Sequence, residues 1–259
     1  MTSAAQYSTE FFSRQQEGSF QSALRILPLV FELVSPRSVI DVGCGVGTWL
    51  EAARTFGAVE VMGLDGDYVD RRLLRIPEDC FRPTDLSRPF ACERTFDLAL
   101  SLEVAEHLPD TSASALVGSL TQLAPVVLFS AAIPKQCGTY HINLQWQSWW
   151  VSQFNRRGFH AVDCIRQRVW NDTDVEWWYA QNMFLMVRED RLQSSPLLRD
   201  EFARSTLPHG VVHPRGYLER IAVAEAGPAG VRDWLALGPR VMRATALRLW
   251  RRLSSGGLR

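Results

Sequence analysis

The chain has 259 residues, of which 46% are hydrophobic and 22% charged, and its 28 basic and 28 acidic side chains balance to a net charge of zero. This length suffices for one large domain with a single buried core, and the composition excludes a disordered or fibrous protein. Enzymes of nucleic acids usually carry a basic excess, so the balanced charge disfavours a nucleic-acid substrate and favours a small or uncharged one.

The five cysteines are scattered and form no Cys-x-x-Cys pair, which is typical of free thiols in a reducing compartment. Residues 1–6 lack the basic flank and the apolar stretch of a signal peptide. No apolar run is long enough to span a bilayer. We therefore expect a cytoplasmic protein without a transmembrane segment.

Residues 7–34 carry apolar side chains at helical spacing and predict two helices, broken near Gly18 and kinked at Pro28. A β-rich run at 38–42 predicts the first strand. Helical and strand patterns then alternate, with helices predicted at 48–55, 68–74 and 111–123 and strands at 60–64, 80–83, 96–101 and 126–131. This alternation predicts an α/β, doubly wound fold with a parallel sheet covered on both faces.

The rest of the chain predicts a helix at 146–157, two β-like runs at 161–169 and 182–187 that form an antiparallel hairpin, and an irregular or partly helical stretch at 189–230. Residues 231–253 form a helix-like pattern of arginine and apolar residues. It is consistent with a weak contact to an anionic membrane, with a partner-binding helix or with a solvated face. We divide the chain into a helical cap (1–35), a core (36–188) and a helical extension (189–259).

The first predicted strand ends in the glycine turn Asp41-Val42-Gly43-Cys44-Gly45-Val46-Gly47. In a doubly wound sheet, ligands bind beyond the carboxyl ends of the strands, and the first glycine turn forms the floor of that crevice. Glycine lets the backbone turn sharply and lets a ligand approach it closely. The dinucleotide-binding spacing would need glycine at the position of Thr48, and Asp41 suits a cationic amine better than a pyrophosphate.

Two more acids follow the next two predicted strands. Asp65 lies about twenty residues after the turn, where a carboxylate can accept both hydroxyls of a ribose. Asp85 follows the third strand, where its side chain can accept from an adenine amino group. Three acids at the ends of consecutive strands predict a site for adenosine that carries an amino-acid tail.

On these motifs and the segment Thr95–Leu108, residues 7–188 resemble the class I S-adenosylmethionine (SAM)-dependent methyltransferases. The resemblance implies a Rossmann-like, mostly parallel, seven-stranded sheet with an N-terminal helical cap and a C-terminal helical extension. It also implies SAM as the cofactor. The predicted cofactor-binding residues are Asp41, Gly43, Gly45, Gly47, Asp65, Asp85, Leu86 and Leu102.

Methyl transfer from a sulfonium needs in-line positioning of the acceptor, and a hydroxyl acceptor also needs help in losing its proton. His107 and His141 follow the fourth and fifth strands, so we predict them as the catalytic bases. Glu103 and Glu106, with these two histidines, are also predicted ligands for Mg²⁺ or another divalent metal that would activate the acceptor oxygen. The Glu-x-x-Glu-His pattern with a distant histidine resembles the plant small-RNA 2′-O-methyltransferases and the ubiquinone-pathway O-methyltransferases.

Residues 129–150 also resemble methyltransferases of bacterial glycan and natural-product biosynthesis, in which a His-x-Asn-x-x-Trp element follows the fifth strand. The sequence therefore predicts O-methylation of a hydroxyl on a small molecule, a sugar or a natural product. An N-methyltransferase, an RNA 2′-O-methyltransferase and a SAM-binding protein without catalysis are the alternatives. Neither the acceptor nor the oligomeric state is identified by the sequence.

Overall fold

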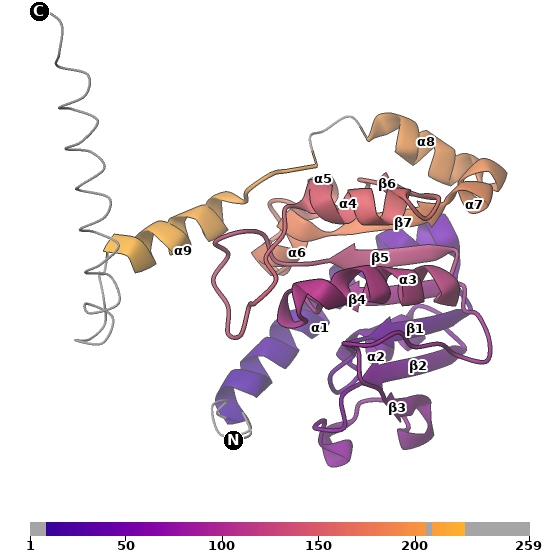
Figure 1. The fold of residues 1–259 in the computed structure, drawn as a ribbon, viewed down its shortest axis with the longest axis horizontal. Coiled ribbons are helices and arrows are strands. Elements are labelled where there is room, and N and C mark those ends of the chain that lie inside the picture. Colours follow the sequence, from indigo (N-terminus) through magenta and orange to yellow (C-terminus); the bar gives the residue numbers. More distant parts are fainter. Residues whose placement is uncertain (1–8, 206–208, 226–259) are drawn as a thin grey trace, which may run out of the picture. The chain divides into compact units, whose positions relative to one another are not determined.

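The computed structural model describes residues 9–205 and 209–225. Their strands form one seven-stranded sheet in the order β3-β2-β1-β4-β5-β7-β6 (Figure 1). The first five strands of the chain pair in parallel, and β7 runs antiparallel to β5 and β6. The predicted α/β, doubly wound fold is confirmed. The strands are β1 (Ser38–Val42), β2 (Glu60–Asp65), β3 (Phe81–Pro83), β4 (Leu98–Leu102), β5 (Val126–Ser130), β6 (Phe159–Val162) and β7 (Phe184–Arg188).

Helices connect these strands and cover the sheet. The α-helices of the described residues are α1 (Thr9–Val34), α2 (Thr48–Thr55), α3 (Ala113–Leu123), α4 (Gln147–Asn155), α5 (Arg166–Val169), α6 (Trp177–Asn182), α7 (Glu189–Ser194), α8 (Pro196–Arg204) and α9 (Pro214–Glu225). Single 3₁₀ turns are η2 (Arg71–Leu73), η3 (Glu78–Cys80), η4 (Ala105–His107) and η5 (Asp110–Ser112). In the described part of the chain, no helix combines the length and the apolar character needed to cross a membrane.

Alternate residues of each central strand face opposite sides of the sheet. Val39 and Leu98 pack in one core cluster with α1 and α2, whereas Ile40 and Val127 pack in a second cluster with α3 and α4. Because both faces are covered, β4 and β5 are buried along their whole length. The only parts of these strands left to bind a ligand are therefore their ends.

The N-terminal region forms one helix, so the predicted break near Gly18 is wrong. The buried face of the helix continues past Pro28: Leu27 and Val30, on either side of the proline, are both fully buried in the core. A Cβ at Gly18 would lie 2.3 Å from Oε1 of Glu176. This glycine therefore permits a close packing contact within the helix instead of ending it.

One further expectation changes in the C-terminal third. The predicted strand 161–169 ends at Val162, and residues 166–169 turn into α5. Contacts divide the chain into two units, 1–216 and 217–259. In the first unit α7 and α8 add Leu192 and Leu198 to the core. The predicted boundary at residue 188 stays a prediction, and the predicted helix 231–253 lies outside the described residues.

A buried ion pair joins Asp163, which follows β6, to Arg166 at the start of α5. Arg166 Nε donates to Asp163 Oδ1 at 2.8 Å, and neither side chain is more than 3% exposed. We predict that Arg166→Met lowers the free energy of unfolding by about 3–5 kcal/mol, because a carboxylate is left buried without its cation. Urea unfolding tests this, with Arg188→Met at the exposed Arg188–Asp190 pair as the control. Equal losses in the two variants would contradict it.

Candidate functional site

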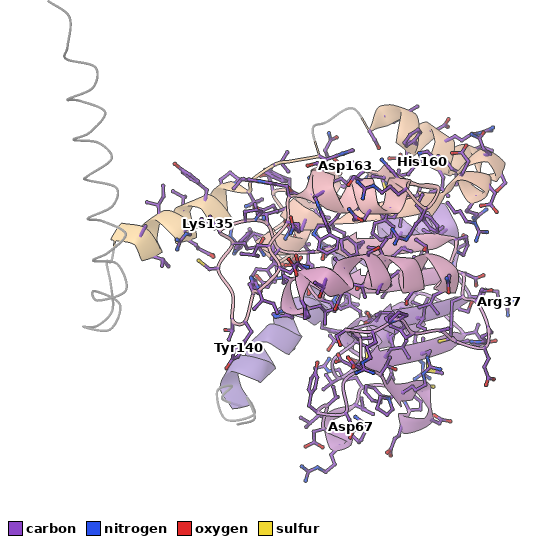
Figure 2. All side chains as sticks on the ribbon, viewed as in Figure 1. Arg37, Asp67, Lys135, Tyr140, His160 and Asp163 are labelled. Carbon is purple, nitrogen blue, oxygen red and sulfur yellow. The ribbon has the colours of Figure 1, made fainter. Side chains whose placement is uncertain are left out.

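The strand order reverses between β1 and β4, which are neighbours in the sheet although β2 and β3 lie between them in the chain. Ligands of doubly wound sheets bind at this point, beyond the carboxyl ends of the strands. Arg37, which precedes β1, and Lys135 and Tyr140, which follow β5, lie at opposite ends of the sheet (Figure 2). The loops that follow β1, β2, β4 and β5 therefore share the carboxyl end.

The glycine turn needs its glycines for two different reasons. Gly43, Gly45 and Gly47 all have positive φ, at 85°, 53° and 87°. A Cβ at Gly43 would lie 2.2 Å from Cγ2 of Val104, so this position also permits contact with the segment after β4. A Cβ at Gly45 would meet nothing within 4 Å, so space is open above the turn.

Asp41 and Asp65 lie beside this turn and are both buried. Asp65 accepts from the backbone N–H of Gly45 at 2.7 Å, from that of Gly66 at 2.6 Å and from the Tyr68 hydroxyl at 2.5 Å. Burial and the neighbouring Asp65 raise the pKa of Asp41 to about 7. The site therefore holds a carboxyl group that a bound cation would favour in its ionised form.

The third predicted acid, Asp85, lies at the surface after β3. Its side chain is 61% exposed, and it accepts from the backbone N–H and the hydroxyl of Ser87. A backbone bond from Thr84 to the carbonyl of Asp65 ties this loop to the end of β2. The predicted cofactor-binding residues Leu86 and Leu102 are 7% and 9% exposed.

Glu103 departs from the helical turn that its spacing predicts. It has a left-handed φ of 54°, and only the later residues of the motif form η4. This backbone turns its carboxylate toward amide groups, so that Gln136 Nε2 and Asn182 Nδ2 both donate to it at 3.2 Å. Sequence reasoning gave these amides no role, because a partner 79 residues away leaves no local pattern.

Residues 131–146, here called the acceptor loop, follow β5 and dock on η4. The backbone N–H groups of Ile142 and Asn143 donate to the carbonyl of Glu106 at 2.8 and 3.0 Å. The side chain of Asn143 donates to the carbonyl of Ala105. These bonds bring the ring of His141 to 5.0 Å from that of His107, measured between centroids. The two predicted histidines therefore lie together.

Glu106, His107 and His141 form a cluster in which one ligand atom of each lies within 4.8 Å of the others. Glu106 is fully buried. The Glu103 carboxyl and the Ala132 backbone lie close to its carboxyl group, but no described residue makes a well-formed hydrogen bond to either oxygen. Burial and the nearby charge of Glu103 raise the pKa of Glu106 well above its usual value. Glu103 is not part of this cluster, although its predicted role included it.

The surroundings of both imidazole rings favour their neutral form. Part of the His107 side chain stays exposed, but desolvation of the rest lowers its pKa. Burial, and then the proximity of His107, lower the pKa of His141. At neutral pH each ring can therefore accept a proton or bind a cation through a nitrogen lone pair.

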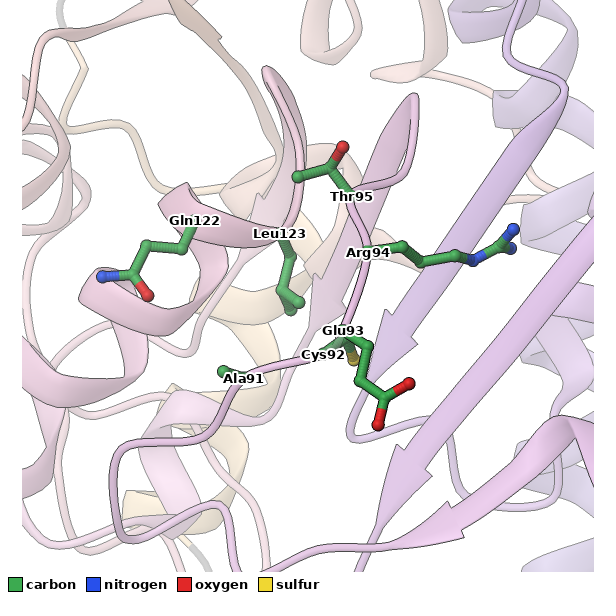
Figure 3. A pocket seen from close by; sticks show the side chains of 7 residues that line it. All are labelled: Ala91, Cys92, Glu93, Arg94, Thr95, Gln122 and Leu123. Atoms are coloured by element: carbon green, nitrogen blue, oxygen red, sulfur yellow. The ribbon is translucent and has the colours of Figure 1, made fainter.

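A hollow of about 500 Å³ lies elsewhere, at the opposite end of the sheet (Figure 3). Arg94 and Thr95, which precede β4, and Leu123, which precedes β5, are among its lining residues. It contains none of the predicted site residues. We therefore place the candidate site at the carboxyl ends of the strands, where the acids, the glycine turn and the histidine pair converge.

Comparison with known proteins agrees with this geometry. A family profile described as "Methyltransferase domain" matches residues 13–182, which is more than half of the chain. The chain belongs to this family. It is a SAM-dependent methyltransferase with the class I fold.

Individual relatives of this methyltransferase are more distant. A ubiquinone biosynthesis O-methyltransferase from Methylobacterium sp. (strain 4-46) is 32% identical over 112 residues, which are 40% of this chain and 44% of that protein. The chain thus spans less than half of that relative's length. Two solved structures share the fold at 16% identity and cover 73% of this chain. They are DesVI of Streptomyces venezuelae (TM-score 0.53, 99% of that chain) and the sugar N-methyltransferase KedS8 of Streptoalloteichus sp. ATCC 53650 (TM-score 0.54, 95% of that chain).

The glycine turn and the acids near it have the chemistry that a SAM site needs. The open space above Gly45 admits a ligand against the backbone. Asp65 lies at the end of β2, where its predicted role is to accept from a ribose. Asp41 is buried beside it, and its predicted role is to hold a cationic amino group. Asp85 lies on the next loop, where its role in holding adenine stays a prediction.

Asp65 tests the cofactor site directly. We predict that Asp65→Ala weakens SAM binding by at least about tenfold, because a charged hydrogen-bond acceptor contributes about 1.5–3 kcal/mol. Asp65→Asn, which keeps one acceptor for the glycine turn, should show an intermediate loss. Asp67→Ala is the matched control, since its carboxylate lies on the same loop but is 89% exposed (Figure 2). Calorimetry measures all three, and unchanged affinity in Asp65→Ala contradicts the site.

The raised pKa of Asp41 predicts a pH dependence. Below pH 7 its carboxyl is mainly protonated in the free protein, and a cationic amino group favours the ionised form. Binding of SAM therefore releases a proton, and affinity should rise about tenfold from pH 5 to pH 6 and level off above about pH 7. In Asp41→Asn this rise should disappear. The same slope in both proteins, measured by calorimetry, would assign the proton to another group.

Proposed function

We propose that this methyltransferase transfers the methyl group of SAM to a hydroxyl of a small, uncharged acceptor such as a sugar or a natural product. The observation that carries the proposal is the cluster of Glu106, His107 and His141 at the carboxyl ends of β4 and β5. A hydroxyl must lose its proton during methylation, whereas an amine can lose its proton afterwards. A paired imidazole and carboxyl cluster therefore suits O-methylation better than N-methylation.

The residues of the cluster have different proposed roles. SAM supplies an activated methyl group when it is bound. His107 and His141, whose pKa values are lowered, are available to accept the hydroxyl proton at neutral pH. The acceptor loop holds His141 through the backbone bonds of Ile142 and Asn143 to Glu106, so the imidazole needs no reorganisation before it acts.

The same three residues fit a divalent metal ion. A buried carboxyl without a well-formed hydrogen bond is costly unless a cation or a proton satisfies it. Within the part of the chain that the structure describes, Nδ1 of His141 is also buried without a hydrogen-bond partner. One carboxylate and two imidazoles form a donor set that divalent transition metals favour. Such an ion, held by Glu106, His107 and His141, would lower the pKa of the acceptor hydroxyl.

The acceptor loop and α4 support an uncharged acceptor. Apart from Lys135, residues 131–155 contain no Asp, Glu, Lys or Arg. Tyr140, Ile142 and Trp146 of the acceptor loop are 50%, 63% and 47% exposed. A phosphate-bearing acceptor would need more cationic partners than this one lysine. The similarity to a ubiquinone biosynthesis O-methyltransferase, though it spans only 40% of the chain, supports a hydroxyl as the methylated group.

Glu106 provides the test of this proposal. We predict that a screen with labelled methyl donor finds a hydroxylated small-molecule acceptor, and that a chelator lowers its turnover at least about tenfold, restored by Mg²⁺ or Mn²⁺. In Glu106→Gln the response to added metal should be lost while SAM affinity stays within about twofold. Glu93→Gln, on the loop at the opposite end of the sheet, is the control.

The outcomes separate the two ways of activating the hydroxyl. Full turnover in chelator, together with a loss of about 10²-fold or more in His107→Ala or His141→Ala, would assign the reaction to a histidine base without metal. Turnover that survives in both histidine variants, or a screen in which only amines are methylated, would contradict O-methylation at this cluster.

A further inference from the structure

Residues 209–213 return to the sheet after α8 and are bonded to three separate elements. The guanidinium of Arg166 donates to the carbonyl of His209 at 2.8 Å, and Nε2 of Gln147 donates to the carbonyl of Val211 at 2.8 Å. The backbone N–H of His213 donates to Oε1 of Gln181 at 2.8 Å. All three partner side chains are at most 2% exposed, so this segment is anchored to buried groups.

Gln181 uses every hydrogen-bonding group of its side chain. Its Oε1 accepts from His213, and its Nε2 donates to Oε1 of Gln136 at 3.0 Å and to Oδ1 of Asn182 at 2.9 Å. A glutamine amide has two donor hydrogens and one acceptor oxygen with two lone pairs, so both donors of Gln181 are used and its oxygen is held by the His213 amide. Moving the 209–213 segment therefore removes the hydrogen bond that Gln181 Oε1 accepts from His213 and disturbs the network of hydrogen bonds around Gln181.

The hydrogen-bond network continues to Glu103. Gln136 donates to Glu103 at 3.2 Å, and Asn182 donates both to Glu103 and to the same Oε1 of Gln136. Gln136 is itself part of the acceptor loop, and its Oε1 also accepts from the backbone N–H of Ile133. Three hydrogen bonds thus lead from the His213 amide to the Glu103 carboxylate, through side chains on α6 and on the acceptor loop.

We propose that Gln181 is a positioning residue, which couples the docking of residues 209–213 to the geometry of the acceptor loop and of Glu103. Hydrogen bonds in a buried network polarise one another, and a half-satisfied network is costly, so its members hold one arrangement together. This role makes the segment after α8 part of the acceptor half of the active site. The kinetic part of the proposal rests on the proposed function, whereas the structural coupling does not.

Gln181→Met tests the coupling, because methionine fills a similar volume without the amide. Gln153→Met is the matched control: Gln153 is also a buried glutamine, 6% exposed, and makes no side-chain hydrogen bond among the described residues. Both variants are first checked for folding by thermal unfolding and for SAM affinity within about twofold of the parent. If Gln181→Met does not fold, Gln136→Met is used instead, because it interrupts the same hydrogen-bond network at a residue of the acceptor loop.

Amide hydrogen exchange is the readout that needs no acceptor. In Gln181→Met we expect exchange at His213, and also at Ile142 and Asn143 of the acceptor loop, to accelerate at least about tenfold, with no change in Gln153→Met. Faster exchange at His213 alone would show that Gln181 only anchors the 209–213 segment, and it would overturn the proposed coupling to the acceptor loop. Unchanged exchange at all three amides would overturn it as well.

Kinetics with any acceptor that is methylated, hydroxyl or amine, gives the second readout. We expect kcat to fall at least about fivefold in Gln181→Met with little change in the KM for SAM, and the double variant with Gln136→Met to lose less than the product of the two single losses. Multiplicative losses would show that the two glutamines act independently and would overturn the proposal. A failure of O-methylation alone leaves the exchange result standing.

Discussion

Because the strand order reverses between β1 and β4, the helices that follow these two strands pack on opposite faces of the sheet. The segments that lead to α2 and α3 therefore separate at the carboxyl end of the sheet and leave room for a ligand between them. Val104 touches the glycine turn across this division, and only the lack of a Cβ at Gly43 permits the contact. The cofactor half and the acceptor half of the site meet at this point.

Each half of the site contains a buried carboxyl group whose charge no side-chain cation of the described residues balances. Asp41 lies in the cofactor half and Glu106 in the acceptor half, and burial raises the pKa of both. Burying an ionised carboxylate without a partner is costly, so such groups are kept where a ligand completes them. We expect the amino group of SAM to be the cation that Asp41 binds. For Glu106, the neighbouring imidazoles point to a proton or a metal ion.

The cofactor half could be predicted from the sequence much more fully than the acceptor half. Gly43, Gly45 and Asp65 are separated by short, regular spacings, because a strand, a tight turn and a helix are local structures with local patterns. His107 and His141 were predicted as partners from their places after neighbouring strands, and their rings do lie together. The helical turn predicted for Glu103 was wrong, because its backbone is left-handed and its carboxylate bonds to amides that lie far along the chain.

The sequence alone determined the α/β class, the parallel strands, the glycine turn and the acids beside it, since each depends on residues close together in the chain. Tertiary structure decided that one helix spans Gly18 and Pro28 and that Gln181 links residues 209–213, through Gln136, to Glu103. It also decided that no described residue makes a well-formed hydrogen bond to the Glu106 carboxyl. The physical reason is that hydrogen-bond satisfaction in a buried network depends on groups from several elements. Only the packed sheet and its loops bring those groups within bonding distance.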